Sequence, residues 1–156
     1  MSMPSAILRS FAGRTLRSGS AAAIATTVVL ALRARAEGQH VVQPVNATSH
    51  WFLGAAAGRS RAVDLKHTLG GYVTHHAASL LWAGVYEALR LWRPQGNPLG
   101  DAAAVSALAA VVDYAVVPKR LTPGWELVVR PRSIALAYAA MGLVLATAAV
   151  GRRGGR

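Results

Sequence analysis

The chain has 156 residues, enough for one domain, and 53% of them are hydrophobic while only 15% are charged. A soluble domain carries about a quarter charged residues, and here the charges stand in clusters between long uncharged stretches, which indicates a membrane protein. The net charge is +11, but the basic residues flank apolar segments, which favours lipid headgroups over nucleic acid as the partner. The absence of cysteine excludes disulfides and thiolate-bound metals.

The first predicted membrane span covers about residues 18–33, just after Arg17. Its uncharged part, Ser18–Leu32, rises about 22 Å as a helix, which is short for a hydrocarbon core of about 30 Å. The flanking arginines can snorkel and make up the difference. The alternative is a signal peptide covering residues 1–36 and cleaved after Ala36. We favour a retained helix because Arg33 and Arg35 directly follow the apolar run, as in a stop-transfer flank.

Residues 44–58 are predicted to form a short interfacial or re-entrant segment and not a span. Pro44 is expected to break any helix through it, and Ser49 is suited to cap a short helix beginning near His50. The aromatic pair Trp51 and Phe52 suits the headgroup level of a bilayer.

Three further spans are predicted at about residues 68–90, 101–118 and 133–151, because each is a long stretch of mostly uncharged residues. A disordered tail is expected at 152–156. The sequence therefore predicts a single all-α membrane domain over residues 1–156, a bundle of four transmembrane helices that could also form a homo-oligomer. With four spans, one side carries 8 Lys and Arg and the other 9, so the positive-inside rule selects neither orientation.

Five ionisable residues are predicted to form a functional polar cluster: His50, His75, His76, Glu87 and Asp113. Charged and titratable groups inside a bilayer are costly and are functional candidates by default. His76 and Glu87 are eleven residues apart, about three helical turns, so they face the same way. One hypothesis is a proton or ion path through His76, Asp113 and Glu87. The favoured alternative is that these residues hold the helices together by buried hydrogen bonds.

Asp113 ends a stripe of small residues, Ala102, Ser106 and Ala109, with helical spacing. We therefore expect its carboxylate to point into the bundle, where a histidine or tyrosine could pair with it.

The pair His75 and His76 also raises the hypothesis of a haem or metal site. Neighbours on a helix point about 100° apart, so they rarely bind one ion together, and a bis-imidazole haem needs a second ligand such as His50 or His40. The chain has no nucleophile elbow, P-loop or dinucleotide fingerprint. We expect no cofactor.

Four sequence segments resemble those of small uncharacterised bacterial multi-pass inner-membrane proteins. They are Asn46–Trp51, Gly71–His76, Val112–Tyr114 and Arg120–Glu126, within roughly residues 44–126. The resemblance implies a multi-pass protein of the bacterial inner (plasma) membrane, and it implies no activity.

The expected function is that of a non-enzymatic membrane component that handles a small solute or protons, or that is a partner in a larger membrane complex. One alternative is a membrane redox protein that binds haem or a metal. The other is a membrane enzyme acting on lipids, with histidine and aspartate as acid and base.

Overall fold

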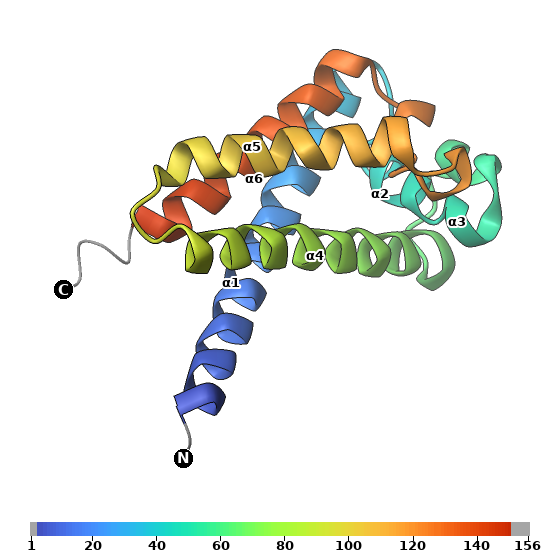
Figure 1. Ribbon diagram of the computed structural model, residues 1–156. Coiled ribbons are helices and arrows are strands. Elements are labelled where there is room, and N and C mark those ends of the chain that lie inside the picture. Colours follow the sequence, from blue (N-terminus) through green and yellow to red (C-terminus); the bar gives the residue numbers. More distant parts are fainter. Residues whose placement is uncertain (1–2, 151–156) are drawn as a thin grey trace.

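The computed structural model describes residues 3–150, and within them the chain forms helices and loops with no strand. Four helices are long: α1 (Met3–Ala36), α4 (Gly70–Trp92), α5 (Pro98–Val111) and α6 (Pro131–Val150) (Figure 1). The predicted all-α class with four long helices is confirmed. The tail predicted to be disordered, residues 152–156, lies outside the described residues.

Short helical elements fill the connections. Two of them are π-helical turns that adjoin long helices: η2 (Leu65–Leu69) leads into α4, and η3 (Val112–Val116) continues α5. The others are α2 (Gln43–Thr48), α3 (His50–Leu53), and the 3₁₀ turns η1 (Ala55–Arg59), η4 (Lys119–Leu121) and η5 (Trp125–Leu127).

Three of the long helices are long and apolar enough to cross a membrane, over Ser5–Ala36, Pro98–Val116 and Pro131–Ala148. These candidate spans indicate a multi-pass membrane protein in contact with a lipid bilayer. Helix α4 has 23 residues, which is long enough, but it is not among the three candidates. Its crossing of the membrane stays a prediction.

Local chemistry explains several helix ends. Asn97 caps α5, because its side-chain oxygen accepts hydrogen bonds from the backbone N–H groups of Leu99 and Gly100. Pro98 follows at the start of the helix, where its missing N–H costs nothing.

The segment predicted to be interfacial differs in detail from its expectation. Pro44 lies in the first turn of α2, so it starts a helix instead of breaking one. Helix α3 does begin at His50, but the predicted cap is wrong: the Ser49 hydroxyl donates back to the carbonyl oxygen of Asn46, at 2.7 Å.

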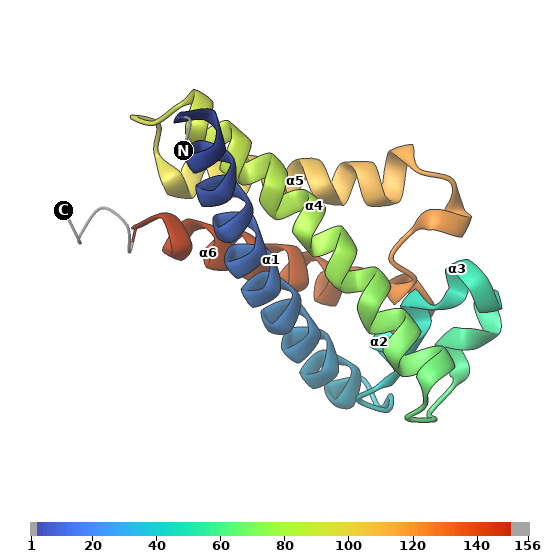
Figure 2. The ribbon, with the colours of Figure 1, turned by 90° about the horizontal axis from the view of Figure 1, so that it is seen from below.

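The helices pack as a crossed arrangement in which α1 contacts α4 and α6, and α5 contacts α6. Helices α4 and α5 share the turn at residues 93–97 and diverge from it (Figure 2). Alanines allow close approach, since Ala22, Ala83 and Ala137 are fully buried between helices. The wedge between the diverging helices is where a cavity forms.

The loops at the open end of the wedge are tied together. Thr122 is the centre of this contact: its carbonyl oxygen lies 2.8 Å from Nε2 of His50 and accepts a hydrogen bond of 2.8 Å from the indole N–H of Trp51. Gly124 has a φ of 81°, a left-handed conformation that suits glycine. These hydrogen bonds hold α3 against the segment that joins α5 to α6.

The junction between α1 and α6 predicts a pH effect. The Ser133 hydroxyl donates to the Glu37 carboxylate at 2.6 Å. This hydrogen bond lowers the pKa of Glu37 below its ordinary value of 4.5. The backbone N–H of Arg130 and the charge of Arg33 lower the same pKa further. A lowered pKa stabilises the fold above the unfolded-state pKa, and this contribution is lost as the pH falls through the folded-state pKa.

We therefore expect the melting temperature of the wild type to fall more steeply than that of Glu37→Gln as the pH is lowered through and below 4.5. Thermal unfolding in detergent across this range measures the difference. If the melting temperatures of the two proteins changed equally with pH, the hydrogen bonds to Glu37 would contribute no pH-dependent stability.

Candidate ligand-binding cavity

A cavity of about 560 Å³ lies in the wedge between α4, the end of α5 and α6. Its volume is within the range of about 300–1,000 Å³ that is typical of small-molecule sites. The lining residues come from several elements: Thr26 of α1, Thr48 of α2, Trp51 and Phe52 of α3, residues between Val73 and Trp82 of α4, Val112 and Asp113 of η3, residues of the 117–125 segment, and Tyr138 and Met141 of α6.

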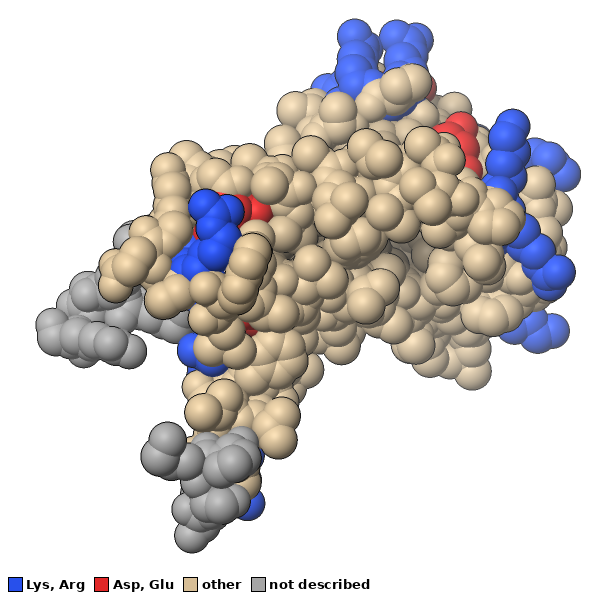
Figure 3. Space-filling model, in the orientation of Figure 1, with Lys and Arg blue, Asp and Glu red and all other residues tan. Residues whose placement is uncertain are grey.

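The rim of the cavity is apolar and exposed. Phe52 is 70% exposed and Leu81 is 62% exposed, and both line the opening. In the space-filling view, the face that carries α4 and α5 is almost free of charged side chains between its ends (Figure 3). The middle of this face is therefore mainly apolar.

One polar group of the cavity is the Asp113 carboxylate. It projects from the π-helical turn η3, a type of distortion that often occurs at functional sites. Its Oδ2 accepts a hydrogen bond of 2.7 Å from the Tyr138 hydroxyl of α6. The expectation that a tyrosine or histidine would pair with Asp113 is confirmed. The small residues of the stripe that leads to it, Ala102, Ser106 and Ala109, are buried.

The second polar group is the His75 side chain of α4. Its Nε2 lies 2.9 Å from the Thr26 hydroxyl and 3.1 Å from the carbonyl oxygen of Ala23, both on α1. The Thr26 hydroxyl donates to the Ala22 carbonyl at 2.8 Å, so the network assigns a proton to Nε2 of His75, and Nδ1 is the acceptor of the neutral ring. These bonds fix the imidazole against α1 at the cavity wall.

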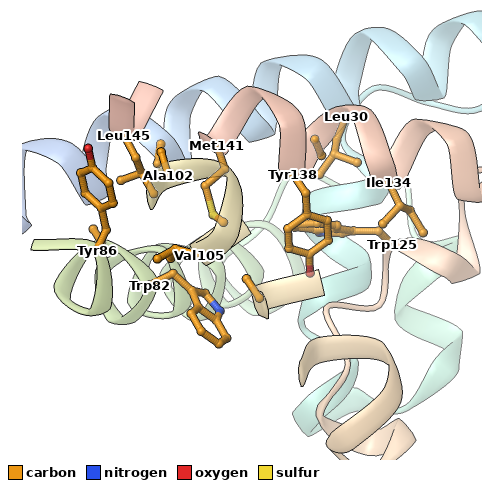
Figure 4. Close-up of a cluster of buried hydrophobic side chains, with 14 of the residues drawn as sticks. Leu30, Trp82, Tyr86, Ala102, Val105, Trp125, Ile134, Tyr138, Met141 and Leu145 are labelled. Carbon is orange, nitrogen blue, oxygen red and sulfur yellow. The ribbon is translucent and has the colours of Figure 1, made fainter. Parts of the chain in front are cut away.

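Aromatic rings connect the two polar groups. The Trp125 ring lies 5.6 Å from His75 and 5.7 Å from Tyr138 between ring centroids. Figure 4 shows Trp125 beside Tyr138, with Trp82 projecting from α4. Since Trp51 and Trp82 also line the space, three of the chain's four tryptophans face this cavity.

The structure brings two of the five predicted polar residues, His75 and Asp113, to one cavity. His50 lines a smaller neighbouring hollow beside Lys119 and Arg120. It is buried there by its contact with the Thr122 carbonyl.

The other two residues, His76 and Glu87, face α1, on the same side of α4 as the spacing predicts. Nε2 of His76 lies 3.3 Å from the Ser20 hydroxyl. Glu87 is fully buried, 3.6 Å from Nε of Arg14 and within 3.5 Å of the Ser18 hydroxyl. These contacts between helices favour the hypothesis that His76 and Glu87 hold α4 on α1.

Sequence reasoning did not single out Thr26, Trp125 or Tyr138. Each comes from a different part of the chain, and only the fold brings them to the same cavity. Trp125 carried one available signal, because it belongs to the polar segment Arg120–Glu126 that contributed to the resemblance. The segments of that resemblance also supply Trp51, His75 and Asp113 to the cavity.

The neighbouring histidines His75 and His76 both contact α1 through the same ring atom. The Nε2 atoms of both His75 and His76 are engaged by hydroxyls of α1. Within residues 3–150, no three His, Asp or Glu side chains converge as they would to hold a metal ion.

Comparisons of the chain with protein-family models, with curated proteins and with solved structures found no match.

Proposed function

We propose that the chain is a non-enzymatic, multi-pass protein of a bacterial inner membrane that binds a small, mainly apolar molecule in the α4–α5–α6 cavity. The observation that carries this proposal is a cavity of about 560 Å³ with mostly apolar and aromatic walls, into which the oriented side chains of His75 and Asp113 contribute polar groups. Such a combination of apolar volume with few oriented polar groups is typical of ligand sites.

The proposal includes a fourth membrane span formed by α4. Helix α4 runs from the end of the bundle that holds α2 and α3 to the turn at residues 93–97, and α5 returns from that turn. Charged side chains gather at the ends of this hairpin, for example Arg93 at the turn and Lys66 before α4. A bilayer placed between these ends surrounds the cavity with lipid, and α4 shields its titratable residues from it by packing His75, His76 and Glu87 inward.

A variant that fills the cavity tests this function. Ala78 lines the cavity on α4, and Ala78→Phe places a ring in the space that the ligand would use. Ala88 is exposed on the same helix and does not line the cavity, so Ala88→Phe is the matched control.

The measurement is a ¹⁹F NMR titration of protein in nanodiscs with the neutral probe 4-fluoroneopentylbenzene, with empty nanodiscs as the blank. We expect saturable binding to the wild type and to Ala88→Phe, and a loss of affinity of about ten-fold or more in Ala78→Phe, since each 1.4 kcal/mol of lost contact is ten-fold. Absence of saturable binding, or equal affinity in both variants, would reject the cavity as a binding site.

A further inference from the structure

The charges around the cavity point to a more specific class of ligand. The chain carries 17 Lys and Arg against 6 Asp and Glu, yet among the described residues no Lys or Arg side chain lines the cavity, and the one acidic side chain there is Asp113. This strongly basic protein therefore has a cavity with one acidic side chain and no basic Lys or Arg side chain in its lining.

The walls add a second property. Trp51, Phe52, Trp82, Trp125 and Tyr138 all line the space. Aromatic faces carry negative potential and attract organic cations, and cages of such rings are a recurrent means of binding quaternary ammonium groups. A carboxylate beside an aromatic wall selects a positive group over a neutral group of the same shape.

One contact orients the Asp113 side chain: the Tyr138 hydroxyl donates to its Oδ2 at 2.7 Å. A carboxylate offers about four acceptor positions, so this donor fixes the group and leaves acceptor capacity for a ligand.

From these observations we propose that the cavity binds lipophilic cations: apolar molecules with one ammonium or comparable positive group, which lies beside Asp113 and among the aromatic rings. This inference rests on the proposed function and specifies its ligand class. The apolar rim at Phe52 and Leu81 receives the apolar part of such a molecule, and the carboxylate replaces part of the hydration that its charge loses.

The test uses two probes of the same shape. 4-Fluorobenzyltrimethylammonium carries the positive charge, and 4-fluoroneopentylbenzene has carbon in place of nitrogen. Both are titrated by ¹⁹F NMR into nanodiscs at pH 8, with empty nanodiscs correcting for partition into lipid.

We expect the wild type to bind the cation more tightly than the neutral probe, after the correction. In Asp113→Asn, which keeps an oxygen to accept the Tyr138 hydroxyl, the dissociation constant of the cation should rise by about ten-fold or more, because close charge pairs are worth at least that much. The dissociation constant of the neutral probe should change much less than that of the cation. Asp113→Glu, which retains the charge, should retain the preference for the cation.

The outcomes separate the two proposals. If the neutral probe binds as tightly as the cation in the wild type, or if Asp113→Asn leaves the preference for the cation unchanged, the ligand class is wrong and the cavity remains a general apolar site. If neither probe binds the wild type saturably, the proposed function itself fails. The comparison of two probes on the wild type does not depend on how well any variant folds.

Discussion

Replacing Gly71 by alanine is expected to remove most of the folded protein. A Cβ at this position would lie 2.1 Å from the carbonyl oxygen of Val45 and 3.0 Å from its carbon, both backbone atoms of α2. Backbone cannot rotate away as a side chain can, so α2 must separate from α4. We expect a loss of about 3 kcal/mol or more in the free energy of unfolding, measured by thermal unfolding and by the yield of monodisperse protein in detergent.

Gly70→Ala is the matched control, because it adds the same methyl group one residue earlier. Its Cβ would meet only the Leu65 carbonyl oxygen, at 3.7 Å, which is an ordinary contact. We expect its stability to be unchanged or slightly raised, since alanine loses less entropy than glycine in a helix. Equal stability of the two variants would mean that α2 does not pack on α4 as described.

The second large effect is expected for Asp101→Ala, at the turn between α4 and α5. The Arg90 guanidinium donates to the Asp101 carboxylate. It also donates to the carbonyl oxygens of Pro94 and Gly96, and both of these distances are 3.1 Å. The Arg90 and Asp101 side chains are only 10% and 4% exposed. Removing the carboxylate leaves the guanidinium largely buried without its counter-charge, and we expect a cost of about 3–5 kcal/mol in the free energy of unfolding.

The control here is Arg93→Ala. Arg93 also contacts Asp101, with its Nη1 at 3.2 Å from Oδ1, but its side chain is 54% exposed. An exposed ion pair contributes about 0–1 kcal/mol, so this variant should unfold close to the wild type. Denaturation of both variants in SDS–detergent mixtures measures the contrast, and a loss for Asp101→Ala as small as that for Arg93→Ala would show that the turn is not held by the Arg90 pair.

The approximate positions of the long helices were predictable from the sequence. Each long uncharged stretch marks the apolar part of a helix, and the charged residues on either side mark where that apolar part ends. The predicted span at 133–151 corresponds to α6, Pro131–Val150. The first helix is longer than the predicted span, beginning at Met3 and not near residue 18. Arg9, Arg14 and Arg17 limit the apolar part of this segment but do not end a helix, since arginine is a good helix former.

The cavity itself was not predictable, because it depends on contacts between residues far apart in the chain. His50 and the Thr122 carbonyl are 72 residues apart, and Tyr138 and Asp113 are 25 apart. The spacing of small residues showed that Asp113 faces inward. It could not show that α4 and α5 diverge, that α2 and α3 fill the open end of the wedge, or that Thr26 of α1 holds His75.

The cavity lies inside the bilayer only if α4 crosses it. The chain has no cysteine, so cysteines introduced one at a time report membrane topology without background labelling. Each variant is labelled with a membrane-impermeant maleimide in sealed spheroplasts. Labelling in permeabilised cells is the control that the cysteine can react. Three exposed positions suffice: Lys66 before α4, Gln95 in the turn after it, and Lys119 after α5. We predict that Lys66→Cys and Lys119→Cys are labelled from one side of the membrane and Gln95→Cys from the other. Labelling of Gln95→Cys and Lys66→Cys from the same side would contradict the four-span arrangement and remove the cavity from the bilayer.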